Sequence, residues 1–234
     1  MKKLVILPTY NEAENIGVVI KNLMQLKVKQ LDMLIVDDNS PDGTGKLADK
    51  LSKMHGNKIY VLHNFKKEGL GVAYMAGFKW AIAKKYDIVC EMDADGSHNP
   101  RDLPKLINAV EQGYDLAIGS RRVRGGKIVG WRWHRHLISW GATTLSRIVL
   151  RLTQKDVTAG FRAYTSDAIR YILSCKIISN GYAFQEETLW ILHKNNFEII
   201  EIPVIFTDRK RGESKLSPKD SKEFFMTLFR LARL

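Results

Sequence analysis

The chain has 234 residues, 45% of them hydrophobic, and this composition excludes a disordered protein and allows one large domain with a sizeable core. Its formal net charge of +12 predicts an anionic partner: nucleic acid, an anionic membrane or a phosphorylated substrate. We expect no signal peptide and no transmembrane helix, because no apolar run approaches the roughly 18 residues that spanning needs. Cys90 and Cys175 lack metal-binding spacing and are expected to be reduced thiols.

The first half of the chain alternates predicted strands and helices. Strands are expected over residues 3–9, 31–36, 58–62, 88–92 and 115–119. Helices are expected after Asn11, with Glu14 as its capping-box partner, and over residues 46–54, 72–84 and 100–112. This alternation predicts a mostly parallel sheet with helices on both faces and a ligand site at the carboxyl ends of the strands.

The second half is less regular. We expect a basic loop over residues 121–130, an aromatic and basic helix over 131–152 and a loop or strand over 156–164. Helices over 166–174 and 185–194, a strand over 197–206, a charged loop over 208–215 and an amphipathic helix over 219–234 follow. No linker interrupts the sequence, so a single domain over residues 1–234 is expected.

Asp93 and Asp95 follow the apolar run before them, one residue apart. Side chains alternate along a strand, so at a strand end these two carboxylates would point to the same side and repel one another. A divalent metal relieves such repulsion, and Mg²⁺ is typically held by one or two carboxylates together with substrate phosphates. The alternative is a polar turn without a ligand, in which Asp is also common.

Eight runs of residues carry a family resemblance that spans nearly the whole chain. They are LPTYNE (7–12), IVDDNSPDGT (35–44), KEGLG (67–71), MDAD (92–95), GSR (119–121), TAGFR (158–162), GYAFQE (181–186) and, within 208–216, Asp208-Arg209 and GESKL. In this order they resemble the family-2 glycosyltransferases of the GT-A fold, and among them most closely the polyprenyl-phosphate mannosyltransferases.

The resemblance implies a GT-A fold with a mostly parallel central sheet and amphipathic helices for a membrane interface. Residues 1–120 would form a Rossmann-like nucleotide-sugar half, 121–216 an acceptor half and 217–234 an interface helix. It also implies a set of nucleotide-sugar-binding residues: Pro8, Tyr10, Glu12, Val36, Asp38, Asp93, Ala94, Asp95, Arg121, Arg209 and Lys215. Tyr10 offers a stacking face, and Glu12 and Asp38 offer hydrogen-bond acceptors.

The implied metal is Mg²⁺ or Mn²⁺, with Asp95 and Ser97 as its ligands and Asp93 as a nucleotide or water-mediated contact. Many relatives carry Gln where this chain has Ser97, and Leu is common where it has Gly96. A serine hydroxyl can still bind the metal or a metal-bound water. His98 is expected to be a solvated turn residue.

Arginines carry the implied acceptor chemistry. Arg121 and Arg135 match positions that hold the acceptor phosphate in the family, and a guanidinium suits phosphate because it is planar, charged and bidentate. Arg209 and Lys215 match the loop that closes over the donor diphosphate, so Asp95, Arg121, Arg135 and Arg209 are the expected catalytic residues. Arg162 either supports the acceptor side or forms a structural ion pair with Glu186 or Asp156.

The implied activity is an inverting, metal-dependent transfer of mannose from GDP-mannose to a polyprenyl or dolichyl monophosphate. The same architecture would serve a polyprenyl-phosphate glucosyltransferase using UDP-glucose, and the charge alone would also suit a basic nucleic-acid-binding module. The enzyme reading predicts no nucleic-acid partner. We expect peripheral association with the cytoplasmic face of a membrane, aided by an anchoring subunit or by a transmembrane segment missing from this sequence.

Overall fold

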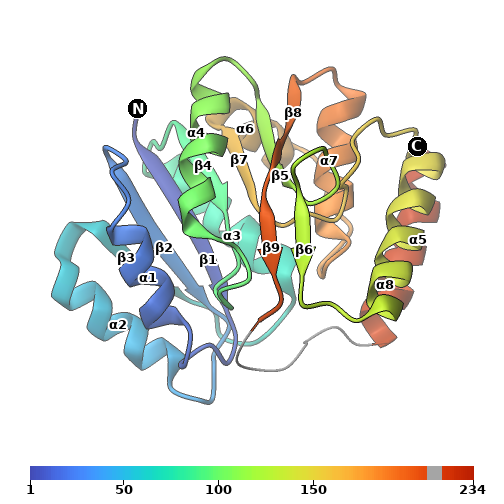
Figure 1. Ribbon diagram of the computed structural model, residues 1–234. Coiled ribbons are helices and arrows are strands. Elements are labelled where there is room, and N and C mark those ends of the chain that lie inside the picture. Colours follow the sequence, from blue (N-terminus) through green and yellow to red (C-terminus); the bar gives the residue numbers. More distant parts are fainter. Residues whose placement is uncertain (210–217) are drawn as a thin grey trace.

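A seven-stranded sheet forms the centre of the protein (Figure 1). The computed structural model describes residues 1–209 and 218–234, without the side chains of 218–220. Lys215, expected to contact the donor, lies outside the described residues. The strand order is β3-β2-β1-β4-β7-β5-β8. All neighbouring pairs are parallel except those of β7, which runs antiparallel to β4 and β5, so the expected mostly parallel sheet is confirmed.

The strands lie close to their predicted positions. They are β1 (Lys3–Thr9), β2 (Leu31–Asp37), β3 (Ile59–His63), β4 (Ile88–Glu91), β5 (Leu116–Ser120), β7 (Arg162–Thr165) and β8 (Ile199–Pro203). A separate two-stranded sheet pairs β6 (Lys127–Val129) with β9 (Ile205–Thr207). The predicted basic loop 121–130 therefore contains a strand.

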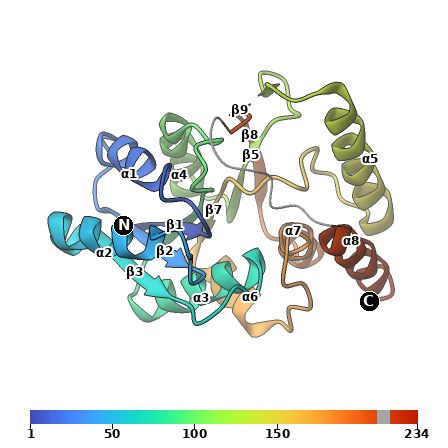
Figure 2. The same cartoon turned by 90° about the horizontal axis from the view of Figure 1, so that it is seen from below.

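Helices cover both faces of the sheet, as predicted (Figure 2). One face carries α1 (Ile16–Met24), α2 (Thr44–His55) and α4 (Leu103–Glu111), with the short 3-10 turns η1 (Gly56–Lys58) and η2 (Pro100–Asp102) beside them. The other face carries α3 (Leu70–Ala83), α6 (Ser166–Ser174) and α7 (Phe184–Lys194). Alternate residues of β1 and β2 enter the two cores, as the period of two along a strand requires.

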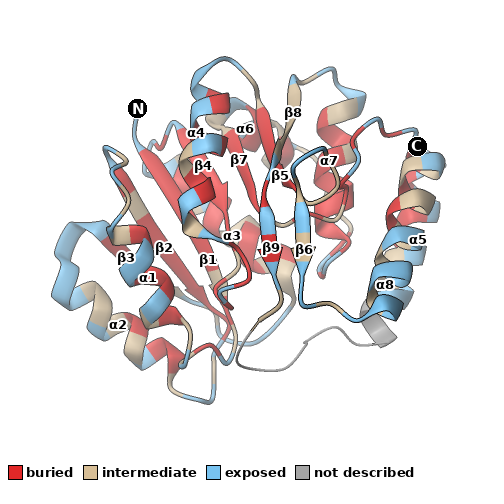
Figure 3. Ribbon diagram, in the orientation of Figure 1, coloured by how far each residue is buried: buried red, intermediate tan, exposed pale blue. Residues whose placement is uncertain are grey.

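Two further helices, α5 (Trp133–Leu150) and α8 (Pro218–Leu231), pack against each other beyond the edge of the sheet (Figure 2). Figure 3 shows exposed residues along much of α5, in contrast to the buried strands. Among the helices that the structure describes, none is both long and apolar enough to traverse a bilayer.

Two further predictions are wrong in where an element begins or ends. The helix expected after Asn11 begins only at Ile16, because Asn11 adopts a left-handed φ of 56°. The following main-chain N–H groups are satisfied from another loop: Glu12 donates to Thr44 Oγ1 and Ala13 to Asp42 Oδ2. The strand expected over 197–206 is two strands in different sheets, β8 and β9, separated by Val204.

The core between the sheet and α3 yields a stability prediction. Phe78 is fully buried there, and its ring lies against Tyr164 and Phe184. We expect Phe78→Ala to lower the free energy of unfolding by about 3–5 kcal/mol in urea denaturation, because it leaves a cavity. Phe65→Ala is the matched control, since Phe65 is 99% exposed, and it should change stability by no more than about 0.5 kcal/mol. Equal effects of the two substitutions would contradict this assignment of the core.

Candidate active site

A cavity of about 420 Å³ opens at the carboxyl ends of β1, β2 and β4. It is lined by eight of the predicted donor-site residues: Pro8, Tyr10, Glu12, Asp38, Asp93, Ala94, Asp95 and Arg209. Parallel strands end at the same edge of a sheet, which is why segments so far apart in sequence meet here. Val36 does not line the cavity, because its side chain belongs to the core between the sheet and α3.

The β1–α1 turn supplies Tyr10 and Glu12. Lys67 Nζ lies 4.1 Å from the centre of the Tyr10 ring, so an ammonium group covers one face of the predicted stacking surface. Glu12 Oε2 accepts a hydrogen bond of 2.8 Å from Asn15 Nδ2. Pro8 is the penultimate residue of β1 and brings the chain to the cavity edge.

The aspartates at the end of β2 and in the β2–α2 loop have two roles: some accept hydrogen bonds that hold the loop, and one faces the cavity. Asp37 accepts from the Thr9 hydroxyl and from Ser40, and Asp42 accepts from Thr44. Asp38 instead faces the cavity, where its Oδ1 accepts from Asn64 Nδ2 at 2.7 Å. Burial, followed by the neighbouring charge of Asp37, raises the pKa of Asp38. The side chains of Asp37 and Asp42 thus stabilise the loop, and the carboxylate of Asp38 lines the cavity.

Asp93 and Asp95 are close together, although not for the predicted reason. Strand β4 ends at Glu91, so both residues lie in a turn and strand alternation does not orient them. Burial and the adjacent Asp95 charge raise the pKa of Asp93 to about 8. Burial also raises the pKa of Asp95, but the hydrogen bond from the Ser97 backbone N–H and the charge of Arg209 contribute to a net shift that is downward.

The residues of this turn fit a hard divalent cation. Asp93 and Asp95 provide carboxylate oxygens, and the Ser97 hydroxyl is buried without a hydrogen-bond partner among the described residues. Oxygen donors are those that Mg²⁺ and Mn²⁺ prefer. Within residues 1–209 and 221–234 there is no cluster of three His, Cys, Asp or Glu side chains suited to a metal. A cation here therefore needs further ligands from water or from a bound phosphate.

Arg209 neutralises part of this acidic turn. Its Nη2 lies 3.3 Å from Asp95 Oδ2, and it follows β9, whose Thr207 donates a backbone hydrogen bond to Ser97 O. An isolated bridge between His98 and Phe206 joins the same two segments. The turn and the chain leading to Arg209 are thus held together by the backbone.

Arg121 lies outside the cavity and forms a buried bidentate ion pair. Its Nε and Nη2 donate to the two carboxylate oxygens of Asp156 at 2.8 and 2.6 Å. The Asp156 side chain is fully buried. Burial raises the pKa of Asp156, but the Arg121 guanidinium outweighs it and holds that pKa below its ordinary value.

Arg135 pairs with Asp208 at 2.8 Å and stacks over Trp131, with its guanidinium carbon 4.2 Å from the ring centre. The Arg121 guanidinium lies 5.8 Å from the same ring. The two predicted acceptor arginines therefore both contact Trp131, and the residue next to Asp208 is Arg209 of the donor cavity. The structure brings both arginines towards one aromatic residue.

His98 and Arg162 differ from expectation. His98 is buried against Phe161 rather than solvated, and burial lowers its pKa to about 4. Arg162 is fully buried and donates to three main-chain carbonyl oxygens, those of Val157, Ala159 and Gln185. No ion pair joins it to either carboxylate proposed from the sequence, and its burial excludes direct contact with an acceptor.

The cavity also contains residues that were not predicted. Lys67, Tyr182 and Glu223 line it, and Glu223 accepts hydrogen bonds from the backbone N–H groups of Asn180 and Gly181. Lys67 and Tyr182 lie within quoted motifs, which could have indicated them. Glu223 comes from α8, far along the chain, and no local signal marks it.

Residues 4–173 match the model of the family described as glycosyl transferase family 2. The chain belongs to glycosyl transferase family 2. It is therefore a glycosyltransferase, and the enzyme prediction is confirmed.

Curated relatives of this glycosyltransferase are similar over most of its length. It is 44% identical over 222 residues to a polyprenol monophosphomannose synthase of Mycolicibacterium smegmatis, covering 95% of this chain and 83% of that protein. It is 46% identical to an undecaprenyl-phosphate mannosyltransferase of Micrococcus luteus, covering 93% of this chain and 88% of that protein. A dolichol-phosphate mannosyltransferase of Pyrococcus furiosus is 38% identical, with all of this chain and 64% of that protein covered.

Solved structures bear out the fold. Glucosyl-3-phosphoglycerate synthase from Mycobacterium tuberculosis, in complex with UDP, superposes with a TM-score of 0.72 over 100% of this chain and 80% of that one. Another structure of that enzyme, with Mn²⁺, UDP and glucosyl-3-phosphoglycerate, gives a TM-score of 0.71. Sequence identity is 18% in both, so the likeness supports the predicted GT-A fold.

The buried ion pair yields a second prediction. Asp156→Asn leaves the Arg121 guanidinium buried without its counter-ion and should lower the free energy of unfolding by about 3–5 kcal/mol at pH 7. Because the pKa of folded Asp156 is depressed, its contribution is present above the ordinary value of 3.8 and is lost as pH falls through the folded pKa. Urea denaturation should therefore show the difference from the unsubstituted protein narrowing in acid.

Asp49→Asn is the control for this experiment. Asp49 forms an exposed pair with His63, with both side chains 49% exposed, and should change stability by less than about 1 kcal/mol. A loss at Asp156 no larger than the loss at Asp49 would contradict the assigned role of the buried pair.

Proposed function

We propose that this glycosyltransferase moves mannose from GDP-mannose to a polyprenyl monophosphate and inverts the anomeric centre. The observation that carries the proposal is the acidic, arginine-paired turn of Asp93 and Asp95 at one wall of the cavity. The names of the curated relatives, polyprenol monophosphomannose synthase and undecaprenyl-phosphate mannosyltransferase, support mannose and a polyprenyl phosphate as the substrates.

The donor would occupy the cavity at the ends of β1, β2 and β4. Asp38 and Glu12 offer carboxylate acceptors for hydroxyl or amine groups of the nucleoside, and Tyr10 offers a ring. Lys67, which covers that ring, would have to move aside or exchange its contact for the donor's phosphates. Residues 1–120 would thus serve chiefly the donor, as expected from the sequence.

Asp95 and Ser97 would hold Mg²⁺ or Mn²⁺ together with the donor diphosphate, with Asp93 as a nucleotide or water-mediated contact. A bound divalent cation supplies Lewis-acid neutralisation of the charge that develops on the departing nucleotide. Arg209 adds a positive charge at the same place, since its guanidinium already lies against Asp95. Burial and the adjacent Asp95 charge raise the pKa of Asp93, and a cation bound at this turn would favour its ionised form.

Arg121 and Arg135, together in the acceptor half of residues 121–216, would orient the acceptor phosphate for attack on the anomeric carbon. Both guanidiniums contact Trp131, and each keeps a carboxylate partner, Asp156 or Asp208, that fixes its orientation. A phosphate monoester is ionised near neutral pH, so the attacking oxygen needs no general base. The single displacement gives a β-linked product.

A lipid acceptor requires a membrane surface. Trp133, Ile138 and Trp140 of α5 and Phe229 of α8 are exposed, and basic residues accompany them on both helices. Tryptophan and basic side chains favour the headgroup region of a bilayer. We propose peripheral binding at the cytoplasmic face through these helices, residues 217–234 included, with a separate anchoring subunit or segment as a further partner.

The turn yields a functional prediction. Asp95→Ala should reduce Mn²⁺-dependent transfer of radiolabelled mannose from GDP-mannose to undecaprenyl phosphate by at least about 100-fold, because it removes an expected metal ligand. Asp49→Asn, on the exposed face of α2, should retain full activity. Substantial metal-dependent transfer by Asp95→Ala would exclude the proposed metal site.

Donor choice is tested by thermal unfolding with Mn²⁺ and either GDP-mannose, UDP-glucose, GDP or UDP. A ligand that binds the folded protein raises its unfolding temperature by mass action. We expect the largest increase with the guanine compounds. A larger increase with UDP-glucose would favour a polyprenyl-phosphate glucosyltransferase, and no increase with any of the four would contradict the donor site.

A further inference from the structure

A second cavity, of about 510 Å³, lies between α5 and the segment that leads into β6. Its lining and that of the donor cavity share no described residue. Five cationic side chains line it: Arg121, Arg122, Lys127, Arg147 and Lys155. We call it the basic pocket.

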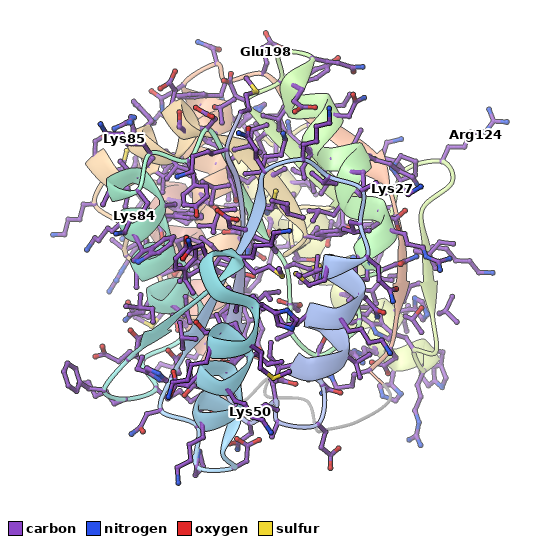
Figure 4. The ribbon with its side chains drawn as sticks, turned by 90° about the vertical axis from the view of Figure 1, so that its left-hand side faces the viewer. Lys27, Lys50, Lys84, Lys85, Arg124 and Glu198 are labelled. Atoms are coloured by element: carbon purple, nitrogen blue, oxygen red, sulfur yellow. The ribbon has the colours of Figure 1, made fainter. Side chains whose placement is uncertain are left out.

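The positive charge of the basic pocket is poorly balanced. Asp156 pairs with Arg121 at 2.6 Å and lies 3.9 Å from Arg122 Nε, so one carboxylate is shared by two guanidiniums. For Lys127, Arg147 and Lys155, no carboxylate of residues 1–209 or 221–234 lies within ion-pair distance. Other cations project outward from separate parts of the surface, as Figure 4 shows for Lys27, Lys50, Lys84, Lys85 and Arg124. Another cavity is lined by Lys46, Lys50 and Lys53 beside the carboxylate of Asp49. The basic pocket differs because five cationic side chains line it and, among the described residues, no carboxylate does.

Unsatisfied polar atoms give independent evidence of a ligand. Thr143 lines the pocket, is only 3% exposed, and its hydroxyl has no hydrogen-bond partner among the described residues. The Nε atoms of Arg122 and Arg147 are likewise buried and without hydrogen-bond partners. Leaving buried donors unpaired costs free energy, and an anion that accepts from several of them recovers it.

The surroundings of the pocket indicate an anion that carries an apolar chain. Trp140 lines the pocket and is 61% exposed, and Leu137 and Ile138 lie beside it on α5, also exposed. Guanidinium groups bind phosphate bidentately, and an exposed apolar helix next to them suits the hydrocarbon of a lipid. A free inorganic anion would leave that apolar surface without a role.

We propose that the basic pocket binds the phosphate group of a membrane lipid, with Arg122, Arg147 and Lys155 as its cationic ligands. The phosphate chemistry follows from the pocket, whereas the membrane setting rests on the proposed function. Two lipids share this chemistry: the polyprenyl monophosphate acceptor, presented beside Arg121, and an anionic phospholipid of the surrounding bilayer.

The test is partitioning of the protein onto three kinds of vesicle in a flotation assay. The vesicles contain phosphatidylcholine alone, phosphatidylcholine with undecaprenyl phosphate, or phosphatidylcholine with phosphatidylglycerol at equal surface charge. We expect Arg147→Gln to weaken binding to at least one kind of charged vesicle about fivefold or more, because it removes a guanidinium that would bind the lipid phosphate directly through charge-assisted hydrogen bonds. The vesicle on which the loss appears identifies the lipid.

Arg151→Gln is the matched control, because Arg151 is exposed just beyond α5, carries the same charge and does not line the pocket. It should weaken binding less than twofold, and Arg147→Lys should retain most of the binding. Unchanged thermal unfolding of each variant shows that it is folded. The proposal is overturned if the unsubstituted protein binds neither kind of charged vesicle, or if the Arg147→Gln and Arg122→Gln proteins bind both kinds normally. It is also overturned if Arg151→Gln weakens vesicle binding as much as Arg147→Gln does.

Titration of the same proteins with GDP and Mn²⁺ separates this inference from the proposed function. Arg147→Gln should bind GDP as the unsubstituted protein does, since the two cavities have separate linings. If the unsubstituted protein binds no GDP, the proposal that GDP-mannose is the donor is contradicted. The vesicle comparison still decides whether the pocket holds a lipid phosphate.

Discussion

The constraint on which the site depends is the crowding of two carboxylates on one short buried turn. Asp93 and Asp95 repel one another, and burial, together with this repulsion, raises the pKa of Asp93 to about 8. A fold does not gain stability from such a pair, so the surroundings must offset it. Arg209 does so from one side, and the backbone hydrogen bond from Thr207 to Ser97 keeps the chain leading to that arginine in place.

The parallel sheet explains why this turn has useful neighbours. The carboxyl ends of β1, β2 and β4 meet at one edge, so Tyr10, Asp38 and Asp95 line one cavity although they are distant in sequence. Strand β7 runs antiparallel to its neighbours β4 and β5, and the residues on the far side of the molecule form a different kind of surface. There, guanidinium groups, Trp131 and the exposed face of α5 create a basic and apolar surface. The acidic cavity and the basic surface thus lie in different parts of the molecule.

Much of the fold can be predicted from the local pattern of apolar residues, because buried strands and amphipathic helices have characteristic hydrophobic periodicities. The errors arise where distant contacts decide the conformation. Asn11 resembles a helix cap, yet Glu12 and Ala13 after it find their hydrogen-bond acceptors in the β2–α2 loop. The apolar run 197–206 resembles one strand, but its two parts join different sheets, with Val204 between them.

The candidate site was predictable to a similar degree. Motif positions indicated eight of the residues that line the cavity, but not which way their side chains face: Val36 points into the core, and His98 is buried against Phe161. Both outcomes depend on packing against helices and loops that a single sequence does not place. The contribution of Glu223 had no local signal at all, because it depends on where α8 packs.

Glu223 connects two regions that would otherwise be independent. Its carboxylate holds the backbone of Asn180 and Gly181 at the wall of the cavity, while Phe225 and Phe229 of the same helix remain open to solvent. Displacing α8 would therefore stretch or break two hydrogen bonds at the cavity wall.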